Sequence, residues 1–327
     1  MERKGIALAG SIIHDKIYGI SAYPPLGSLA QIASIENAVG GLVPNDAIDL
    51  KKLRPSIDVF ALGRVGDDAS GSYVLGVMKE QGVNTDGVKV SKGGVTGFTD
   101  VMSIVGGQRT FFAHSGTNDE FCSEDIPWDT LSASMLHLGY FLLLKKIDEG
   151  EGLLILKEAK KRGIKTSIDL VSEHSDRYKL VLPCLKYVDN IIVNELEAGA
   201  MAGIEPTLEN LPAIADKLLE LGVSERVIIH SPALGIVKTR DNLTVLPSYK
   251  LPDGFIKGTA GAGDAFCSGA LLGIYEQRSD LEILEFATLS AISNLRAVDG
   301  TSSVDNLDKL KLELGNLPRQ TLKVNFN

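Results

Sequence analysis

The chain has 327 residues, of which 33 are Lys or Arg and 42 are Asp or Glu, so its formal net charge is −9. This length suits one large or two ordinary domains that need no disulfide, and the acidic surplus excludes binding of nucleic acid or of an anionic membrane through charge. The three cysteines, Cys122, Cys184 and Cys267, have neither zinc-ligand nor redox spacing, which is typical of a reducing cytoplasm. No apolar run has the length of a membrane span. We therefore expect a cytoplasmic protein.

The first half of the chain combines buried strands with an antiparallel pair. Apolar runs at 5–13 and 57–63 predict core strands, and a helix is expected over 46–53. Residues 96–105 and 110–114 flank Gly106-Gly107, which is typical of a hairpin turn. This pair predicts a small accessory sheet, either as a flap over a site or as a simple edge hairpin.

The second half alternates between short apolar runs and helical stretches. Strands are expected at 135–140, 166–170, 190–193 and 226–230. Helices are expected at 152–162, 178–185, 211–221, 265–275 and 281–298. This alternation predicts right-handed crossovers and a largely parallel sheet covered on both faces.

A glycine-rich loop precedes the expected helix over 265–275. Residues 258–264 read Gly-Thr-Ala-Gly-Ala-Gly-Asp. Glycines directly before a helix let backbone N–H groups converge on an anion at the positive helix end, which indicates a phosphate site. Asp264 beside it could take the proton of an attacking hydroxyl during phosphoryl transfer. The alternative is a plain glycine turn with Asp264 as the N-cap.

Two further clusters allow a functional and a structural interpretation. Gly40, Gly41 and Asn45 could line a polyol site, or they could simply start a helix. Asp15 follows the first strand, where ligands of open α/β sheets bind, although a lone Asp there can equally be solvated.

A third cluster follows the expected strand at 190–193. Asn194 and Glu197 could form a capping box at the start of a helix, or they could hold Mg²⁺ directly or through water near a phosphate.

In this order the motifs resemble the ribokinase-like (PfkB) family of carbohydrate kinases over nearly the whole chain. The matching segments are Gly10-Ser11-x-x-x-Asp15, Gly40-Gly41-x-x-x-Asn45, Val65-Gly66-Asp67-Asp68-x-x-Gly71, His114-Ser115-Gly116-Thr117-Asn118, Asn194-x-x-Glu197 and Gly261-Ala262-Gly263-Asp264. The last of these is the most specific.

The resemblance implies a single three-layer α/β/α domain over 1–327, with a β-sheet lid from about 12–29 and 96–114. It implies ATP-dependent transfer of the γ-phosphoryl group to a hydroxymethyl of a small sugar, and a possible homodimer through the lid. Asp264 would be the general base and Gly261, Ala262 and Gly263 the anion hole. The other implied contacts are Asp15, Gly40, Gly41 and Asn45 with the sugar, Asn194 and Glu197 with Mg²⁺, and Asn194, Ser231, Gly235, Thr259, Gly261 and Gly263 with the nucleotide.

Several positions depart from the family pattern. Gly258 and Ala260 stand where Asp and Thr are usual, at positions that often form a monovalent-cation site, so potassium dependence stays open. Pro232 replaces a usual Gly near the nucleotide, and Leu42 replaces a frequent Lys of the sugar motif.

Three alternatives to a free-sugar kinase remain. One is a nucleoside kinase of the same family, with a lid aromatic stacked on the base. Another is a catalytically weak sugar-binding protein on the same scaffold. The last is a phosphosugar kinase that would use Arg109 or Arg177 for a second phosphate.

Overall fold

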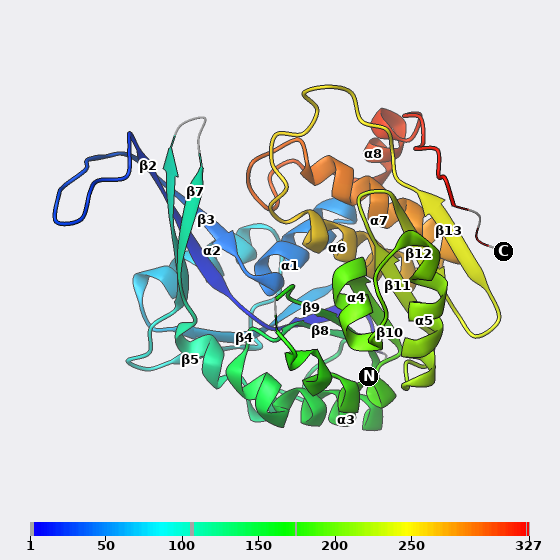
Figure 1. The fold of residues 1–327 in the computed structure, drawn as a ribbon. Coiled ribbons are helices and arrows are strands. Elements are labelled where there is room, and N and C mark those ends of the chain that lie inside the picture. The colour runs from blue at the N-terminus through cyan, green and yellow to red at the C-terminus, as the bar shows by residue number, and fades with distance from the viewer. Residues whose placement is uncertain (1–2, 105–107, 174, 325, 327) are drawn as a thin grey trace.

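The computed structural model describes residues 3–104, 108–173, 175–324 and 326, and its body is built on a nine-stranded sheet (Figure 1). The strand order is β13-β12-β11-β10-β9-β8-β1-β4-β5. The run from β11 to β5 is parallel, whereas β12 and β13 pair antiparallel at one edge. The strands are β1 (Ile6–Ala9), β4 (Val59–Gly66), β5 (Val88–Ser91), β8 (Met135–Phe141), β9 (Lys165–Leu170), β10 (Asn190–Asn194), β11 (Arg226–His230), β12 (Leu234–Lys238) and β13 (Leu243–Pro247).

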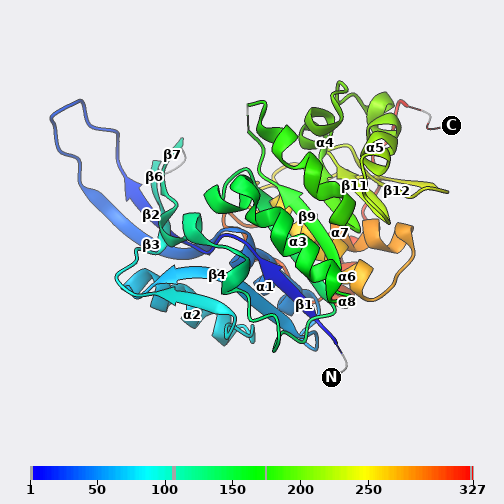
Figure 2. The same ribbon diagram turned by 90° about the horizontal axis from the view of Figure 1, so that it is seen from below.

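Helices cover both faces of this sheet, as Figures 1 and 2 show. Successive residues of β1 point to opposite faces, so that Ile6 and Leu8 join one apolar core and Ala7 and Ala9 the other. The first core lies under α1 (Leu42–Leu53), α2 (Ala69–Glu80), α6 (Ala262–Tyr275), α7 (Asp280–Asn294) and α8 (Leu307–Leu314). The second lies under α3 (Gly152–Lys161), α4 (Glu195–Ala202) and α5 (Leu211–Glu220). The predicted three-layer α/β/α architecture with a largely parallel sheet is confirmed.

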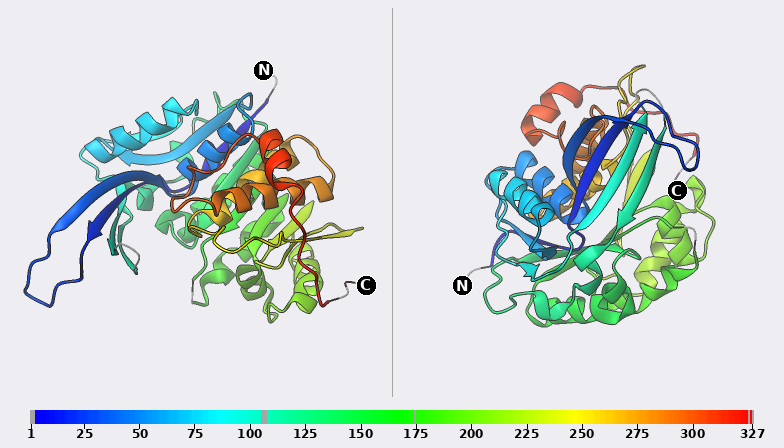
Figure 3. Two further views of the ribbon diagram at one scale, coloured as in Figure 1. Left: turned by 90° about the horizontal axis from the view of Figure 1, so that it is seen from above. Right: turned by 90° about the vertical axis from the view of Figure 1, so that its left-hand side faces the viewer.

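A second, four-stranded sheet projects from one side of the body (Figures 1 and 3). Its order is β3-β2-β6-β7, and β2 pairs parallel with β6 while the two outer pairs are antiparallel. The strands are β2 (Ile13–Ile20), β3 (Ile32–Gly40), β6 (Gly97–Ile104) and β7 (Arg109–His114). We call this sheet the lid. The strands of the predicted hairpin do pair antiparallel, and its turn at Gly106-Gly107 lies outside the described residues.

The lid includes β3, which lies beyond the predicted range of 12–29. Residues 32–38 of this strand are exposed or nearly so, and only Gly40 at its end is buried. A strand that buries neither face gives no alternating pattern, because its stability comes from pairing with β2. The sequence therefore gave no signal for it.

Two of the motifs named in the sequence analysis join the lid to the body. Asp68 caps α2 by accepting from Gly71 N (2.8 Å) and also accepts from the backbone N (2.9 Å) and Oγ1 (2.6 Å) of Thr96, just before β6. Asn118 exchanges two hydrogen bonds of 2.9 Å with the backbone of Ile12, just before β2. These side chains fix where β2 and β6 leave the main sheet.

Four predicted helices differ by more than one residue. α1 begins at Leu42, four residues before the predicted start at 46. The stretch predicted as a helix at 178–185 is a pair of short 3₁₀ helices, Arg177–Leu180 and Leu182–Tyr187, with Pro183 near the start of the second. Proline lacks the N–H needed to continue an α-helix, which explains the break. α6 begins at Ala262, three residues earlier than predicted, and α7 ends at Asn294, four residues earlier. Among the described residues, no helix combines the length and apolarity needed to cross a membrane.

Candidate active site

The glycine loop before α6 lies at the carboxyl ends of the parallel strands, the edge where ligands of open α/β sheets bind. Gly261 is the N-cap of α6 with φ +74°, and a Cβ there would lie 2.6 Å from the Cα of Gly300. Only glycine satisfies both constraints. A Cβ on Gly263, in contrast, would meet no atom within 4 Å, so this residue faces open space. The N-terminal turn of α6 therefore presents its backbone to a cavity.

Asp264 is not the helix cap. It is the third residue of α6, and its carboxylate partners come from two other elements. Asn45 Nδ2 in α1 donates to Oδ2 at 2.7 Å, and the Tyr140 hydroxyl in β8 lies 2.9 and 3.0 Å from the two carboxylate oxygens. The capping interpretation of Asp264 is therefore wrong, because the side chain turns toward the sheet edge.

The surroundings of Asp264 suit a proton acceptor. Its side chain is almost fully buried, and burial raises its pKa to about 6. The neighbouring charge of Asp169 adds to this rise, while the hydrogen bonds from Asn45 and Tyr140 oppose it. A carboxylate of this kind is largely ionised at neutral pH and yet basic enough to accept a proton from an alcohol.

A large cavity opens beside the first turn of α6. Its volume is about 620 Å³. Five residues of the predicted nucleotide site and anion hole line it: Asn194, Ser231, Thr259, Ala262 and Gly263. Its apolar wall includes Leu234, Leu251, Ile256, Phe266 and Ile292. An apolar slot that ends at a helix N-terminus has the chemistry needed for a flat base joined to a polyphosphate.

Two of the predicted nucleotide residues do not line this cavity. A Cβ on Gly235, in β12, would face Leu284 (3.0 Å) and Phe266 (3.5 Å), so this glycine allows close packing of the helices on the sheet. Gly261 does not line the cavity, and a side chain there would meet Gly300. As the N-cap of α6 in a left-handed conformation, Gly261 sets the direction in which this helix starts.

Asn194 and Glu197 form a capping box at the start of α4, which the sequence analysis gave as the alternative to a Mg²⁺ site. Asn194 Oδ1 accepts from Glu197 N (2.9 Å), and Glu197 Oε2 accepts from Asn194 N (3.1 Å). Glu197 Oε1 also accepts from Ser172 Oγ (2.7 Å) and from Asn194 Nδ2 (2.8 Å). Burial raises the pKa of Glu197 to about 7. Both residues nevertheless line a cavity of about 70 Å³ together with Asp264.

The predicted sugar residues lie along the junction between β3 and α1. A Cβ on Gly40 would lie 2.3 Å from Oδ2 of Asp15, so glycine is what lets this lid carboxylate reach across. Gly41 has φ +82°, and a side chain there would meet Ser11 O at 2.8 Å. Asn45, one turn into α1, connects this junction directly to Asp264. The structure therefore brings the predicted sugar residues close to Asp264.

Three site residues were missed from the sequence: Tyr140, Asp169 and His230. All lie at or near the carboxyl ends of strands, and all line the cavity around Asp264. The Tyr140 N–H donates to Asp169 Oδ1 at 2.6 Å, and Tyr140 has φ +57°, an unusual conformation for a residue other than glycine. Their position at the carboxyl ends of predicted strands was the one available signal.

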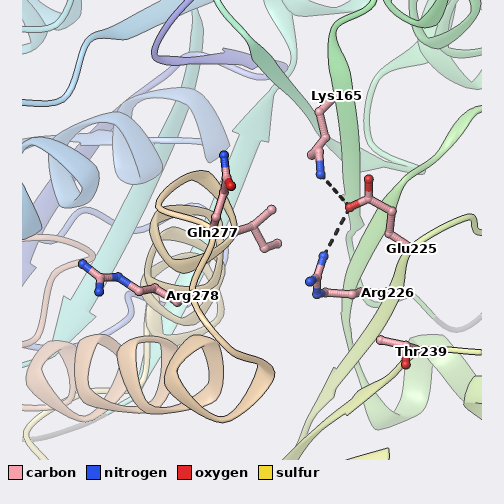
Figure 4. Close-up of a pocket in the computed structure, with 7 residues that line it drawn as sticks. Lys165, Glu225, Arg226, Thr239, Gln277 and Arg278 are labelled. Atoms are coloured by element: carbon pink, nitrogen blue, oxygen red, sulfur yellow. Dashed lines mark hydrogen bonds and ion pairs between the residues drawn. The ribbon is translucent and has the colours of Figure 1, made fainter. Parts of the chain in front are cut away.

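A separate cleft of about 390 Å³ lies at the opposite edge of the sheet, where Lys165 and Arg226 start β9 and β11 (Figure 4). Its cations are paired. Lys165 Nζ and Arg226 Nη1 lie 2.7 and 3.2 Å from the same oxygen of Glu225, and Arg226 Nε lies 2.8 Å from Asp280. Among the residues that line this cleft, the one carboxylate, Glu225, is partly exposed and paired, unlike the buried Asp264.

Comparison with known proteins identifies the family. Residues 8–306 match the model of the pfkB family carbohydrate kinases. The chain belongs to this family. As a pfkB family member it is a carbohydrate kinase, and the family-level resemblance of its motifs is confirmed.

Individual relatives agree with this assignment. A ribokinase from Schizosaccharomyces pombe is 28% identical over 277 residues, which cover 82% of this chain and 84% of the relative. Among solved structures, Arabidopsis thaliana ribokinase complexed with ribose and ATP superposes with a TM-score of 0.81 at 21% identity, covering 97% and 100% of the two chains. The Methanocaldococcus jannaschii nucleoside kinase has a TM-score of 0.76 at 18% identity, covering 96% and 99%. These structural likenesses support the fold of this pfkB kinase.

Proposed function

We propose that this carbohydrate kinase transfers the γ-phosphoryl group of ATP to a hydroxymethyl group of a small free sugar. The observation that carries the proposal is the buried Asp264 carboxylate, which Asn45 and Tyr140 hold at the open N-terminal turn of α6. A simple binding protein has no use for a basic carboxylate beside an anion site. The arrangement suits proton removal and phosphoryl stabilisation at one point.

In the proposed reaction, Asp264 accepts the hydroxymethyl proton as the sugar oxygen forms its bond to Pγ. The bond from Pγ to the bridging oxygen breaks, and ADP leaves with that electron pair. The N–H groups of Gly263 and Asp264, in the first turn of α6, would stabilise the charge on the moving phosphoryl group. The apolar cavity beside them would hold the base of ATP.

Asn194 and Glu197 are the proposed holders of Mg²⁺. Their amide and carboxylate oxygens are the ligand type that Mg²⁺ prefers, and this ion commonly keeps several of its waters. Because the capping box engages both Glu197 oxygens, contact through water fits these residues best. When bound, the ion would neutralise charge on the phosphates.

The sugar would bind between the lid and the body, on Asp15, Gly40, Gly41 and Asn45. Asp15 comes from lid strand β2, whereas Asn45 belongs to the body and touches the base. A sugar held by both would draw the lid over the reacting atoms. Exclusion of water protects the phosphoryl group from hydrolysis.

A monovalent cation is not part of the proposal. A Cβ on Gly258 would lie 2.7 Å from Ala297 O and 2.9 Å from the Cα of Val298. The backbone at 297–298 therefore leaves no room for a side-chain ligand at this position.

A phosphorylation assay over free sugars and nucleosides tests the proposal. We expect ATP-dependent product with at least one free sugar, and a loss of about 10²–10⁴-fold in kcat for Asp264→Asn. Asp280→Asn is the matched control, since Asp280 also lies in the first turn of a helix, α7, outside the site. Phosphorylation of nucleosides alone would establish the nucleoside-kinase alternative. Sugar binding without any turnover would establish the weak-binder alternative.

We also propose that two copies associate through the lid. Large apolar side chains are exposed on its two edge strands, namely Ile32 and Ile35 on β3 and Phe111 and Phe112 on β7. Open sheet edges with exposed apolar groups favour pairing between chains. Light scattering of the full chain should give twice the chain mass, and the double variant Ile35→Lys/Phe111→Lys should give the mass of one chain. A parent protein with the mass of one chain would contradict the dimer.

A further inference from the structure

Behind the base lies a buried cluster that the proposed reaction does not use. Asp46 of α1, His137 of β8 and Cys267 of α6 are each at most 2% exposed. One ligand atom from each residue lies within 4.8 Å of those from the other two. The three residues come from three separate elements, and their side chains converge on one point.

Asp46 is the clearest sign that the cluster lacks a component. Neither of its carboxylate oxygens has a hydrogen-bond partner among the described residues, although the residue is fully buried. A buried, unpartnered carboxylate is costly unless it is paired or coordinates a metal. No Lys or Arg of the described chain pairs with Asp46, Asp169 or Asp264, so three neighbouring carboxylates share this interior without such a cation.

The distances suit a tetrahedral ion. Cys267 Sγ lies 3.5 Å from His137 Nε2, and Asp169 Oδ2 lies 3.7 Å from the same nitrogen. Zinc–sulfur and zinc–nitrogen bonds of about 2.3 and 2.0 Å, at a tetrahedral angle, separate the two ligand atoms by about 3.5 Å. The other ring nitrogen, His137 Nδ1, lies 2.9 Å from Ser167 Oγ. A proton on Nδ1 leaves Nε2 free as a ligand, the usual arrangement of histidines that bind a metal.

We propose that Asp46, His137 and Cys267 bind a divalent transition-metal ion. The mixture of thiolate, imidazole and carboxylate favours zinc over magnesium or calcium. The three ligands lie in a closed interior, which favours a structural role for the ion. The ion joins α1, β8 and α6, and it balances negative charge beside Asp264. The cavity of about 70 Å³, which Asp169 and Cys267 both line, gives the ion a path inward.

The test uses the full chain and measures metal, independently of kinase activity. Elemental analysis of protein grown with added zinc should find one zinc per chain. Exchange for cobalt should give a sulfur-to-cobalt charge-transfer band and the strong visible bands of a tetrahedral ion. In Cys267→Ser the charge-transfer band should vanish, and zinc affinity should fall by on the order of a hundredfold or more.

A second variant avoids any change to the core site. The double variant Cys122→Ser/Cys184→Ser keeps Cys267 as its sole thiol, so it should retain both the zinc and the charge-transfer band. It decides the question even where Cys267→Ser does not fold. A parent chain that contains no metal and takes up neither zinc nor cobalt overturns the site. A cobalt spectrum without a thiolate band, or a band that the double variant loses, overturns it equally.

Discussion

The hydroxyl of Tyr140 lies 2.9 and 3.0 Å from the two carboxylate oxygens of Asp264, so a residue at the end of β8 holds a carboxylate at the start of α6. The same tyrosine donates its N–H to Asp169. Burial, reinforced by Asp264 and Asp169, raises the pKa of Tyr140 well above its ordinary value, so the phenol keeps its proton and acts as a donor. Tyr140 is therefore a positioning residue for the proposed base.

Tyr140→Phe should shift the acidic limb of the pH–rate profile. The hydrogen bond from Tyr140 lowers the pKa of Asp264, so its loss raises that pKa above about 6. The proposed base must be deprotonated to act. As the pH is lowered, the variant therefore loses activity at a higher pH than the parent does. At pH 6–7 we expect a loss of roughly tenfold, as for one hydrogen bond to a charged group.

The control is Tyr275→Phe, which removes a hydroxyl bonded to Gly5 N, away from the site. A uniform loss of rate at every pH in Tyr140→Phe, with no shift of the limb, would contradict the positioning role.

Alanine substitutions at two neighbouring glycines, Gly263 and Gly261, should impair the protein in different ways. Gly263 lies in ordinary helical conformation, and a Cβ there would meet no atom within 4 Å. The melting temperature of Gly263→Ala should therefore equal that of the parent. Its methyl group would, however, enter the proposed phosphoryl site. We expect a fall in kcat on the order of a hundredfold, as for a misplaced reactant.

Gly261→Ala places a side chain at φ +74° and against Gly300. It should lower the free energy of unfolding by at least about 1–2 kcal/mol. Denaturant unfolding of the two variants, measured beside their kinetics, checks the contrast. Equal losses of stability in both would refute it.

Asp15→Asn should weaken sugar binding without affecting the nucleotide. Replacing a carboxylate that accepts from sugar hydroxyls costs about ten- to a hundredfold in the KM for sugar. The KM for ATP should stay unchanged, because Asp15 belongs to the lid and the large cavity to the body. Glu36→Gln, an exposed change on the neighbouring strand β3, serves as the control. An equal rise in both KM values would show that Asp15 acts on the fold instead.

His230 should make the free energy of unfolding decrease as the pH is lowered. Burial lowers the pKa of His230 to about 4, and its ring packs on Phe266 with centroids 4.6 Å apart. Between pH 6.5 and 4 the unfolded chain takes up a proton that the folded chain does not, so stability falls as pH decreases. The loss is at most about 3 kcal/mol, reduced by the partial exposure of this side chain.

Unfolding measured at pH 7 and at pH 4.5 should show a smaller difference for His230→Asn than for the parent. His114→Asn, on the exposed lid strand β7, should retain the parental difference. If the difference between pH 7 and pH 4.5 were as large in His230→Asn as in the parent, His230 would not be the source of the acid sensitivity.

The sequence by itself determined the layers of the body and pointed to Asp264 as the proposed base. The apolar runs of β8 to β11 and the helices between them are local patterns, and a parallel α/β sheet follows from their alternation. The loop before α6 and Asp264 are contiguous, so their chemistry was visible in seven residues. Asn45 and Asp15 were predicted because each belongs to a short contiguous motif that begins with glycine.

Only the tertiary structure decided which distant residues surround that base. Tyr140 and Asp169 reach Asp264 because β8 and β9 are neighbours in the sheet, an order that no local pattern encodes. The spacing of the cysteines indicated no metal, yet folding places Cys267 beside His137 and Asp46 from two other elements. Periodicity reports burial along one element, whereas a site depends on contacts between elements far apart in the chain.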